Sequence, residues 1–214
     1  MLSMTELTEE LSQAKQEVSI CVASKYANAQ QLRALYTDGA RCFGENRVQD
    51  ALPKIAELSE LSDIDWHFIG RLQRNKVRKV LEHFDCIQSV DRLALAESID
   101  SVAEEKGKIV PIFVQVNVAA DPQKAGFHPD ELPDALEKIQ GFRNLSLRGI
   151  MTMVPMEPDS EKLLEYFRLG RSIFDQYQRK YPSIQQLSMG MSQDYPLAVE
   201  AGATMVRIGR RLFQ

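Results

Sequence analysis

The feature that most constrains the fold is a regular alternation of short β-rich runs with helical patterns. Eight such runs recur along the 214 residues, each followed by a polar or glycine-containing turn and then by apolar residues at helical spacing. We expect strands at residues 18–24, 42–44, 66–70, 85–90, 109–118, 147–153, 185–190 and 204–209. Strict alternation implies parallel strands with right-handed crossovers, and eight strands are the number that closes a barrel.

Helical patterns fill the intervals between these runs, at 28–38, 46–60, 73–83, 91–106, 129–140, 159–180 and 194–201, after an N-terminal helix at about 4–16. Asn28, Asp91 and Asp159 stand where helix caps are expected. No linker or low-complexity segment divides the chain, so we predict one domain over 1–214, a single (β/α)8 TIM barrel of the α/β class. A doubly wound open sheet is the alternative, but it needs a glycine-rich turn after the first strand, and "ASKYANA" has no glycine.

Composition limits the partners of such a barrel. The 26 Lys and Arg against 30 Asp and Glu give a formal net charge of −4, spread along the chain, which argues against nucleic-acid or membrane partners. No apolar run approaches the roughly 20 residues of a membrane span, and the acidic N-terminus lacks a signal-peptide core, so we expect a cytoplasmic protein. Without an obvious exposed apolar stripe, a monomer is expected.

The basic run at 71–79 is interpreted first as a solvated helix face and second as a docking surface for a protein or an anion.

The three cysteines, Cys21, Cys42 and Cys86, lie in strand-like segments outside any CxxC pair. Buried small side chains are therefore favoured over a disulfide, a metal site or a nucleophile. We expect no metal.

Polar residues and glycines gather where the last two strands end, which is where chemistry gathers in a barrel. "LSMGMS" at 187–192 and "RIG" at 207–209 supply glycines, hydroxyl groups and the N–H groups of the helix that follows. Either segment alone is most simply a turn with helix caps. Two of them on neighbouring strands favour a phosphate site, which recurs at this place in such barrels.

Lys25 and Arg207 lie at the ends of the first and last strands, which pair in a closed barrel. An arginine between apolar neighbours faces either solvent or a buried partner, and Lys25 taken alone is a solvated lysine. A lysine beside a second cation in a partly dry pocket has a lowered pKa and becomes a usable amine nucleophile. Such a lysine near a phosphate site suits an aldehyde-bearing phosphate ester, and pyridoxal 5′-phosphate (PLP) fits that description.

Six motifs also match one known family in order and spacing: "ASKY", "FGENRVQD", "WHFIGRLQRNK", "QVNVAADPQKAGF", "GIMTM" and "LSMGMSQDYPLAVEAGATMVRIG". Over essentially its whole length the chain resembles the pyridoxal phosphate homeostasis proteins, and among them the cyanobacterial branch. That family includes bacterial, yeast and human PLP-binding proteins related to the N-terminal barrel of alanine racemase. The resemblance implies a single (β/α)8 barrel of the fold-type III class that binds PLP.

The resemblance also implies roles for individual residues. Lys25 in "ASKY" matches the lysine that forms the internal aldimine, and Arg207 matches the arginine that faces the pyridine nitrogen. The matches to the phosphate loop are Ser188, Met189, Gly190, Ser192, Gly209 and residue 210, and those to strand ends that line the pocket in relatives are Asn46, His67 and Met151.

Two positions depart from the family pattern. Arg210 stands where many relatives carry a threonine whose hydroxyl can bind the phosphate, and Arg71 stands where a histidine is common. The backbone N–H of residue 210 can still donate to a phosphate. Both changes add positive charge near the carboxyl end of the barrel.

Arg207 bears on what bound PLP could do. A protonated arginine discourages protonation of the pyridine nitrogen and so weakens the ring as an electron sink. Alanine racemase takes a second acid/base, a tyrosine, from another domain, and this sequence ends just after its eighth strand. The first hypothesis is therefore a protein without robust catalysis that holds, buffers or delivers PLP in vitamin B6 and amino-acid homeostasis, with PLP-dependent apoenzymes as transient partners.

Two other classes stay open. One is a PLP enzyme, such as an amino-acid racemase, that uses His67 or Tyr26 as its acid/base. The other is a phosphate-binding barrel isomerase in which Lys25 is only electrostatic. A visible aldimine absorbance separates the isomerase from the PLP carrier and the PLP enzyme. Isotope exchange at the α-carbon of amino acids then separates the PLP enzyme from the carrier.

Overall fold

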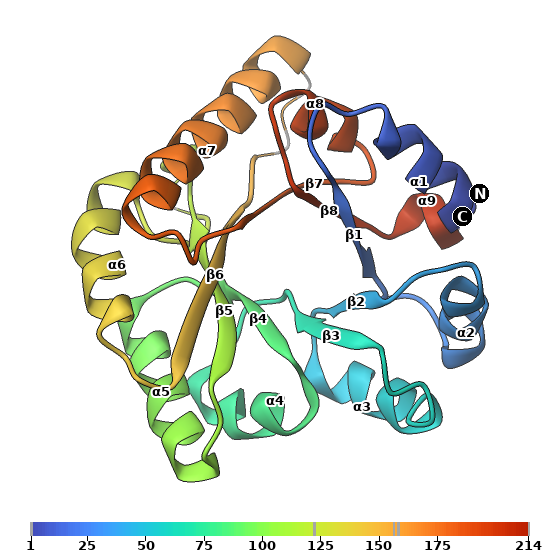
Figure 1. Ribbon diagram of the computed structural model, residues 1–214, viewed down its shortest axis with the longest axis horizontal. Helices are drawn as coiled ribbons and strands as arrows, with labels where there is room; N and C mark the ends of the chain where they lie inside the picture. Colours follow the sequence, from blue (N-terminus) through green and yellow to red (C-terminus); the bar gives the residue numbers. More distant parts are fainter. Residues whose placement is uncertain (1, 122, 156, 158, 214) are drawn as a thin grey trace.

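A closed barrel of parallel strands forms the centre of the molecule, with helices around it (Figure 1). The computed structural model describes residues 2–121, 123–155, 157 and 159–213. Each strand pairs with its neighbour in sequence, and β1 closes the ring on β8, with Ser19 opposite Met205 and Val22 opposite Ile208. The predicted single (β/α)8 architecture is confirmed, and the open doubly wound sheet is excluded.

All eight expected strands are present, within a few residues of their predicted ends. They are β1 (Ser19–Ala23), β2 (Cys42–Glu45), β3 (Asp65–Phe68), β4 (Cys86–Val90), β5 (Val110–Val116), β6 (Leu145–Thr152), β7 (Gln186–Met191) and β8 (Met205–Ile208). The alternate residues of each strand point into the barrel or out toward the helices. Inward-facing residues at the carboxyl ends of these strands are therefore the ones that can reach a common pocket.

Helices follow the strands, as the alternating pattern predicts. They are α1 (Met4–Ser12), α2 (Ala29–Thr37), α3 (Val48–Glu57), α4 (Val77–His83), α5 (Leu93–Lys106), α6 (Leu132–Gln140), α7 (Ser160–Lys180), α8 (Tyr195–Glu200) and α9 (Arg210–Phe213), with 3-10 turns at Arg74–Lys76 and Pro129–Glu131. In the part of the chain that the structure describes, none of these helices combines the length and the apolar character needed to cross a membrane.

Two details of the helix ends differ from expectation. Helix α1 ends at Ser12, because Gln13 caps it and the side chain of Gln16 turns back to donate hydrogen bonds to the carbonyls of Val199 and Ala203. Asn28 and Asp159 cap helices as predicted. Asp91 does not, because its carboxylate pairs with the guanidinium group of Arg92 one residue before α5 begins.

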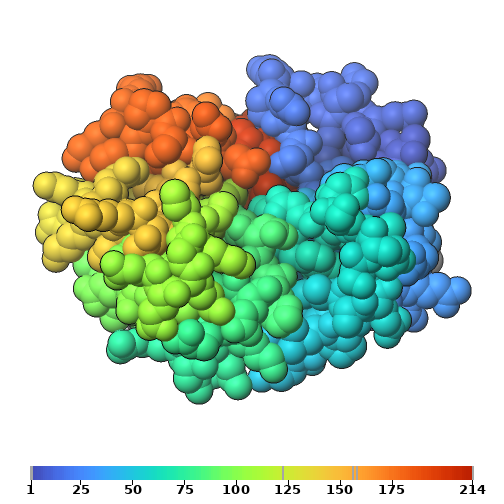
Figure 2. All heavy atoms as spheres, turned by 60° about the horizontal axis from the view of Figure 1, so that its bottom comes forward, coloured from blue at the N-terminus to red at the C-terminus, as the bar shows by residue number. Residues whose placement is uncertain are grey.

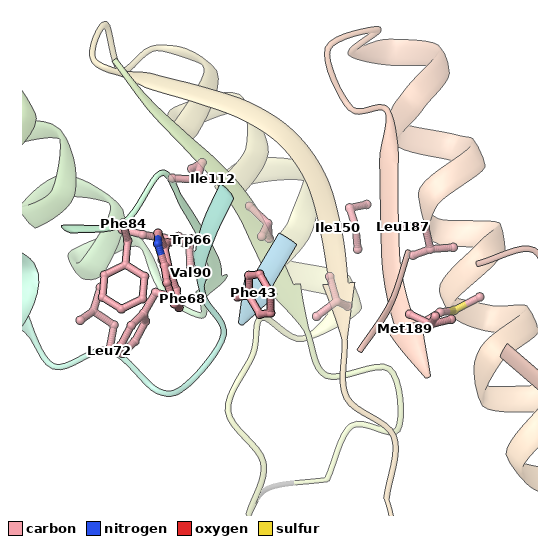
Figure 3. Close-up of a cluster of buried hydrophobic side chains, with 14 of the residues drawn as sticks. Phe43, Trp66, Phe68, Leu72, Phe84, Val90, Ile112, Ile150, Leu187 and Met189 are labelled. Carbon is pink, nitrogen blue, oxygen red and sulfur yellow. The ribbon is translucent and has the colours of Figure 1, made fainter. Parts of the chain in front are cut away.

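The main hydrophobic core lies between the outer face of the barrel and the helices (Figure 3). The Phe43 and Trp66 rings lie 5.6 Å apart between centroids, and Phe68 meets Phe84 edge-on at 5.3 Å. A smaller cluster fills the barrel interior and consists of Cys21, Cys86, Phe113, Met151 and Met205. This packed interior closes the barrel between its two ends, so the two ends can carry separate sites.

The two ends of the chain lie side by side, with α1 next to α9 (Figure 1). The Leu2 backbone N–H donates to the Arg211 carbonyl at 2.8 Å, and the Tyr195 hydroxyl donates to Glu10. The Arg211 guanidinium in turn donates to the Tyr195 oxygen at 2.7 Å. From the side, the segments follow one another around the molecule in chain order (Figure 2). The first and last segments therefore form one continuous wall of the barrel.

Candidate functional site

A cavity of about 230 Å³ opens at the carboxyl ends of the strands, the end at which barrel chemistry is expected. Residues from the loops after β1, β2, β3, β6, β7 and β8 contribute to it. Its lining consists of Ala23, Lys25, Tyr26, Asn46, Ile69, Met153, Met191, Ser192, Arg207, Gly209, Arg210 and Phe213. Six of the eleven residues expected at the cofactor site are among them, and they come from both ends of the sequence.

Lys25 reaches this cavity from an anchored turn. The side chain is exposed, and its ammonium group lies 4.5 Å from the centre of the Tyr26 ring. Ser24, just before it, is fully buried and donates to Glu45 Oε1 at 2.6 Å. Lys54 Nζ donates to the same Glu45 oxygen at 2.6 Å and to the Ser24 carbonyl at 2.8 Å. A buried ion pair therefore holds the backbone that carries a solvent-accessible lysine.

Arg207 approaches the same cavity from inside the barrel, where it is 4 % exposed. Its Nη1 donates to the Ser188 carbonyl and hydroxyl oxygens, both at 2.8 Å, and its Nη2 donates to the Thr152 carbonyl at 2.9 Å. Burial lowers the pKa of Arg207 to about 10, so the group stays charged at neutral pH. Uncharged oxygens thus fix the guanidinium group, and the Asp194 carboxylate acts on its charge only through space.

The glycines of the expected phosphate loop are required by close approaches. Gly190 has a φ of +85°, and a Cβ atom there would lie 2.5 Å from the Ala198 side chain on α8. A Cβ atom on Gly209 would lie 2.7 Å from the Ala23 carbonyl oxygen. The Gly209 N–H donates to the Ser192 hydroxyl oxygen at 3.0 Å, which ties the loop after β7 to the loop after β8. The two segments predicted to form one site are therefore joined directly.

Five of the expected residues do not line this cavity, and Gly190, which packs against α8, is one of them. Met151 belongs to the interior cluster, and Met189 faces outward, where its sulfur lies 3.5 Å from the position a Cβ atom would take on Gly170 of α7 (its packing is visible in Figure 3). Ser188 is fully buried inside the barrel, where it binds Arg207. His67 points toward the opposite end of the barrel, where its Nε2 meets Asp65 at 2.8 Å.

The physical reason for these differences is depth in the barrel. Residues two positions further along a strand share the same face but lie closer to the carboxyl end. Ile69 therefore takes the place expected for His67, and Met153 takes the place expected for Met151. The period-two alternation of "WHFIG" and "GIMTM" could have shown which face these residues occupy, but it could not show the depth of the cavity.

A chain of hydrogen bonds crosses the barrel interior beneath the cavity. It runs from Asp65 to His67 (2.8 Å), from His67 Nδ1 to Gln88 Nε2 (2.6 Å), from Gln88 Oε1 to the Ser188 hydroxyl (2.7 Å), and from there to Arg207 (2.8 Å). All members except Asp65 are buried. Ser188 and Gln88 thus act on the site through Arg207, a role that no local sequence pattern indicates.

Arg71, one of the two departures from the family pattern, lies outside this cavity. Arg71 borders a separate open groove of about 1030 Å³, together with Arg47, Arg74, Lys76 and Arg92. Arg210, the other departure, does line the 230 Å³ cavity. Only one of the two added positive charges is therefore positioned to affect a ligand there.

The cavity combines an accessible amine, a fixed guanidinium group, a second arginine and apolar side walls formed by Ile69, Met153 and Met191. Cations and the Ser192 hydroxyl suit a phosphate group, and the apolar walls suit a planar ring. An amine that is exposed at the edge of such a cavity can react with a carbonyl group. The arrangement therefore fits a small aromatic phosphate ester that carries an aldehyde.

Comparisons with known proteins agree with this geometry. Residues 7–214 match the family described as "Alanine racemase, N-terminal domain". The chain is 39 % identical over 214 residues to the pyridoxal phosphate homeostasis protein of Synechocystis sp., covering all of this chain and 98 % of that one. It is 40 % identical over 192 residues to the protein of the same name from Aquifex aeolicus, covering 89 % of this chain and 84 % of that one.

Solved structures give the same answer. PipY of Synechococcus elongatus PCC7942 with PLP bound superposes with a TM-score of 0.89 at 40 % identity, covering 97 % of this chain and 98 % of that one. The form of PipY without PLP gives a TM-score of 0.90 at 41 % identity, with the same coverage. The chain belongs to the family of pyridoxal phosphate homeostasis proteins, whose barrel is that of the N-terminal domain of alanine racemase.

Proposed function

We propose that the protein binds PLP in the 230 Å³ cavity and acts in PLP homeostasis, with residues 1–214 forming one PLP-binding domain. The observation that carries the proposal is the meeting of Lys25 and Arg207 in one cavity from opposite ends of the sequence. PLP offers an aldehyde to an amine, a pyridine nitrogen to a donor and a phosphate to cations. The lining supplies a partner for each of these groups.

Lys25 is the group that bonds to PLP covalently. Its amine attacks the aldehyde carbon of PLP, and loss of water leaves a carbon–nitrogen double bond, so the link is a Schiff base. Burial of Ser24 and the Lys54–Glu45 pair beneath it fix the backbone from which Lys25 extends. Because the turn is already ordered, less of the binding free energy is lost in ordering it when PLP binds.

Arg207 orients the ring. Its Nη1 and Nη2 atoms are engaged by Ser188 and Thr152, which leaves the Nε–H donor with no acceptor among the described residues. This N–H donates to the pyridine nitrogen. Because the guanidinium group stays charged at neutral pH, the pyridine nitrogen stays unprotonated and the ring is a weak electron sink.

The phosphate lies at the joined loops after β7 and β8, where Ser192 and the N–H groups that follow Gly209 can donate to it. Met189 and Gly190 serve this loop through the backbone. Arg210 adds its side-chain charge at the same wall of the cavity. Asn46 contributes from the loop after β2.

The protein holds PLP and releases it to PLP-dependent apoenzymes, rather than using it in a reaction of its own. Its relatives are named for homeostasis and not for a catalytic activity. His67 lies too far down the barrel to act as an acid/base on a ligand in the cavity. A cytoplasmic monomer is the form proposed for this role.

A racemase is the second candidate, and one observation supports it. The Tyr26 side chain is 75 % exposed and lies beside Lys25 at the cavity. A phenol at this place could exchange a proton with the α-carbon of an amino acid bound in the cavity. Deuterium exchange at the α-carbon of alanine or other amino acids tests this activity, and Tyr26→Phe should abolish it if it exists.

The proposed binding mode is tested by spectroscopy and mass mapping. The protein incubated with PLP should show the visible absorbance of a Schiff base, and borohydride should remove this band and fix a pyridoxyl group on Lys25. Lys25→Ala should lose the band, whereas Lys138→Ala, a change at an exposed lysine on α6, should keep it. A modified lysine other than Lys25, or an undiminished band in Lys25→Ala, would overturn the assignment.

A further inference from the structure

A second cavity, of about 340 Å³, lies at the amino ends of the strands, opposite the cavity with Lys25. Its lining includes the first residues of β1, β2, β3, β4, β7 and β8. The side chains in this lining that can ionise or bind a metal ion are Cys42, Asp65, His67, Asp85, Cys86 and Met205. This end of a barrel is normally concerned with stability, so such a set of side chains needs another explanation.

Two thiols and an imidazole converge at the inner wall of this cavity. Each of Cys21, Cys42 and His67 offers a ligand atom, and these three atoms all lie within 4.8 Å of one another. Cys21 and Cys42 stand directly opposite each other on β1 and β2. The spacing is that of side chains that can share one ion after small rotations, since zinc–sulfur and zinc–nitrogen bonds are about 2.3 and 2.0 Å long.

Gly44 allows this convergence. It lies between Ala23 on β1 and His67 on β3 in the register of the sheet, on the same inward face as Cys42. A Cβ atom at position 44 would lie 2.7 Å from the Cys21 sulfur. Any larger residue would therefore fill the space through which the β1 thiol and the β3 imidazole approach each other across β2.

The imidazole is held in place from outside the cluster. Asp65 meets His67 Nε2 at 2.8 Å, and Gln88 Nε2 lies 2.6 Å from Nδ1. An ion takes one of these two nitrogens and leaves the other hydrogen-bonded. A histidine with one hydrogen-bonded nitrogen is the usual arrangement of metal sites, because the second contact fixes both the tautomer and the ring orientation.

The chemistry of the three groups selects the ion. Two sulfur ligands and one imidazole suit a thiophilic cation, whereas Mg²⁺ and Ca²⁺ take oxygen ligands. Binding releases the thiol protons, and two thiolates balance the charge of a divalent ion, which makes burial tolerable. The carboxylates of Asp65 and Asp85 lie at the same cavity and favour entry of a cation, although Arg148 also lines it.

We propose that Cys21, Cys42 and His67 bind one thiophilic metal ion, Zn²⁺ or Cu⁺, at the amino end of the barrel. The fourth coordination position faces the 340 Å³ cavity and is filled by water or by a small exogenous ligand. The three residues come from three strands and follow no sequence motif, so the pattern appears only when the barrel closes. This site is distinct from the PLP cavity, to which His67 is connected through Gln88, Ser188 and Arg207.

The test is a metal titration of the full-length, reduced protein. Zn²⁺ is measured by competition with a chromophoric zinc chelator, and Cu⁺ by competition with a Cu⁺ chelator under anaerobic conditions; the tighter ion identifies the occupant. Co²⁺ serves as a spectroscopic probe. We expect one ion per chain and, with Co²⁺, the near-ultraviolet charge-transfer absorbance of thiolate ligation.

Matched variants locate the site. Cys21→Ser, Cys42→Ser and His67→Gln should each weaken metal binding by more than about 10-fold. Changes to residues that only contact a ligand already weaken binding at metal sites by about this factor, and loss of a ligand should cost more. Cys86→Ser is the control, because it removes the third thiol of the chain, which contacts His67 but lies outside the group of three ligand atoms. If a variant fails to fold, the Co²⁺ spectrum of the unmodified protein still decides whether thiolates bind the ion.

Three results would overturn the proposal. One is the absence of stoichiometric binding of any of the three ions to the unmodified protein. Another is binding that Cys86→Ser weakens as much as Cys21→Ser and Cys42→Ser do. The last is a Co²⁺ complex without thiolate charge transfer, which would place the ion on carboxylates elsewhere.

Discussion

The buried ion pair beneath Lys25 gives a prediction whose size follows from the structure. Lys54 is 9 % exposed and Glu45 is fully buried, and their charged atoms lie 2.6 Å apart. In Lys54→Met, Glu45 keeps only the Ser24 hydroxyl as a partner, and the Ser24 carbonyl keeps only the Ala27 N–H as a donor. Breaking a buried pair by removing one partner costs about 3–5 kcal/mol, because a buried charge is left uncompensated.

The assay is urea unfolding followed by the fluorescence of Trp66, the only tryptophan of the chain, which is 6 % exposed. The control is Arg33→Met, which breaks an ion pair between two exposed side chains, Arg33 and Glu60. Exposed pairs contribute about 0–1 kcal/mol. The buried variant should therefore lose at least about 2 kcal/mol more than the exposed one.

A second variant separates the effect of leaving Glu45 without its charged partner from the effect of losing the Lys54 side chain. The double variant Lys54→Met with Glu45→Gln removes both charges, and it should recover most of the lost stability, since uncharged replacements of a buried pair are often neutral. PLP affinity should fall in the single variant, because the backbone before Lys25 loses its anchor. The reasoning is refuted if Lys54→Met costs no more than Arg33→Met, or if the double variant is less stable than the single one.

Three further changes test the cavity with the same urea assay and with PLP titration. Gly190→Ala should cost about 2–4 kcal/mol, from left-handed strain plus the 2.5 Å approach to Ala198, and a loss below about 1 kcal/mol would contradict that account. Ser188→Ala should cost about 1–3 kcal/mol and weaken PLP binding through Arg207, which loses the Ser188 hydroxyl and keeps only backbone carbonyls as partners; unchanged PLP affinity would mean that Arg207 does not need this contact. Arg210→Gln should raise the PLP dissociation constant several-fold with little effect on stability, and an unchanged constant would show that the side chain faces solvent.

Much of the fold was predictable because local and global signals agree. Most strands carry β-branched or aromatic residues, the longer helices carry an apolar stripe, and Asn28 and Asp159 mark helix starts, so eight repeats of the unit leave few other closed arrangements. Lys25 and Arg207 could be paired from sequence because closure of a parallel barrel makes the first and last strands neighbours.

The sequence could not predict how deep in the barrel each inward-facing residue lies, or which residues stand opposite each other on neighbouring strands. His67 and Met151 share the inward face with the residues that line the cavity, but each lies one layer lower. The cluster of Cys21, Cys42 and His67 depends on which residues stand opposite each other across strands. Such pairings are set by tertiary packing, which a single sequence does not encode locally.

The contact between the two ends of the chain has a consequence for synthesis. The cavity is walled by residues 23–26 on one side and by residues 207–213 on the other, and these segments are held together by the pairing of β1 with β8, while the Leu2 to Arg211 hydrogen bond joins the two ends of the chain. Contacts of such long sequence separation form only after most of the chain has been ordered. A ribosome-bound chain that lacks its last strand can therefore present Lys25 but not the guanidinium and phosphate-binding groups opposite it. Cofactor capture then becomes a property of the finished polypeptide alone.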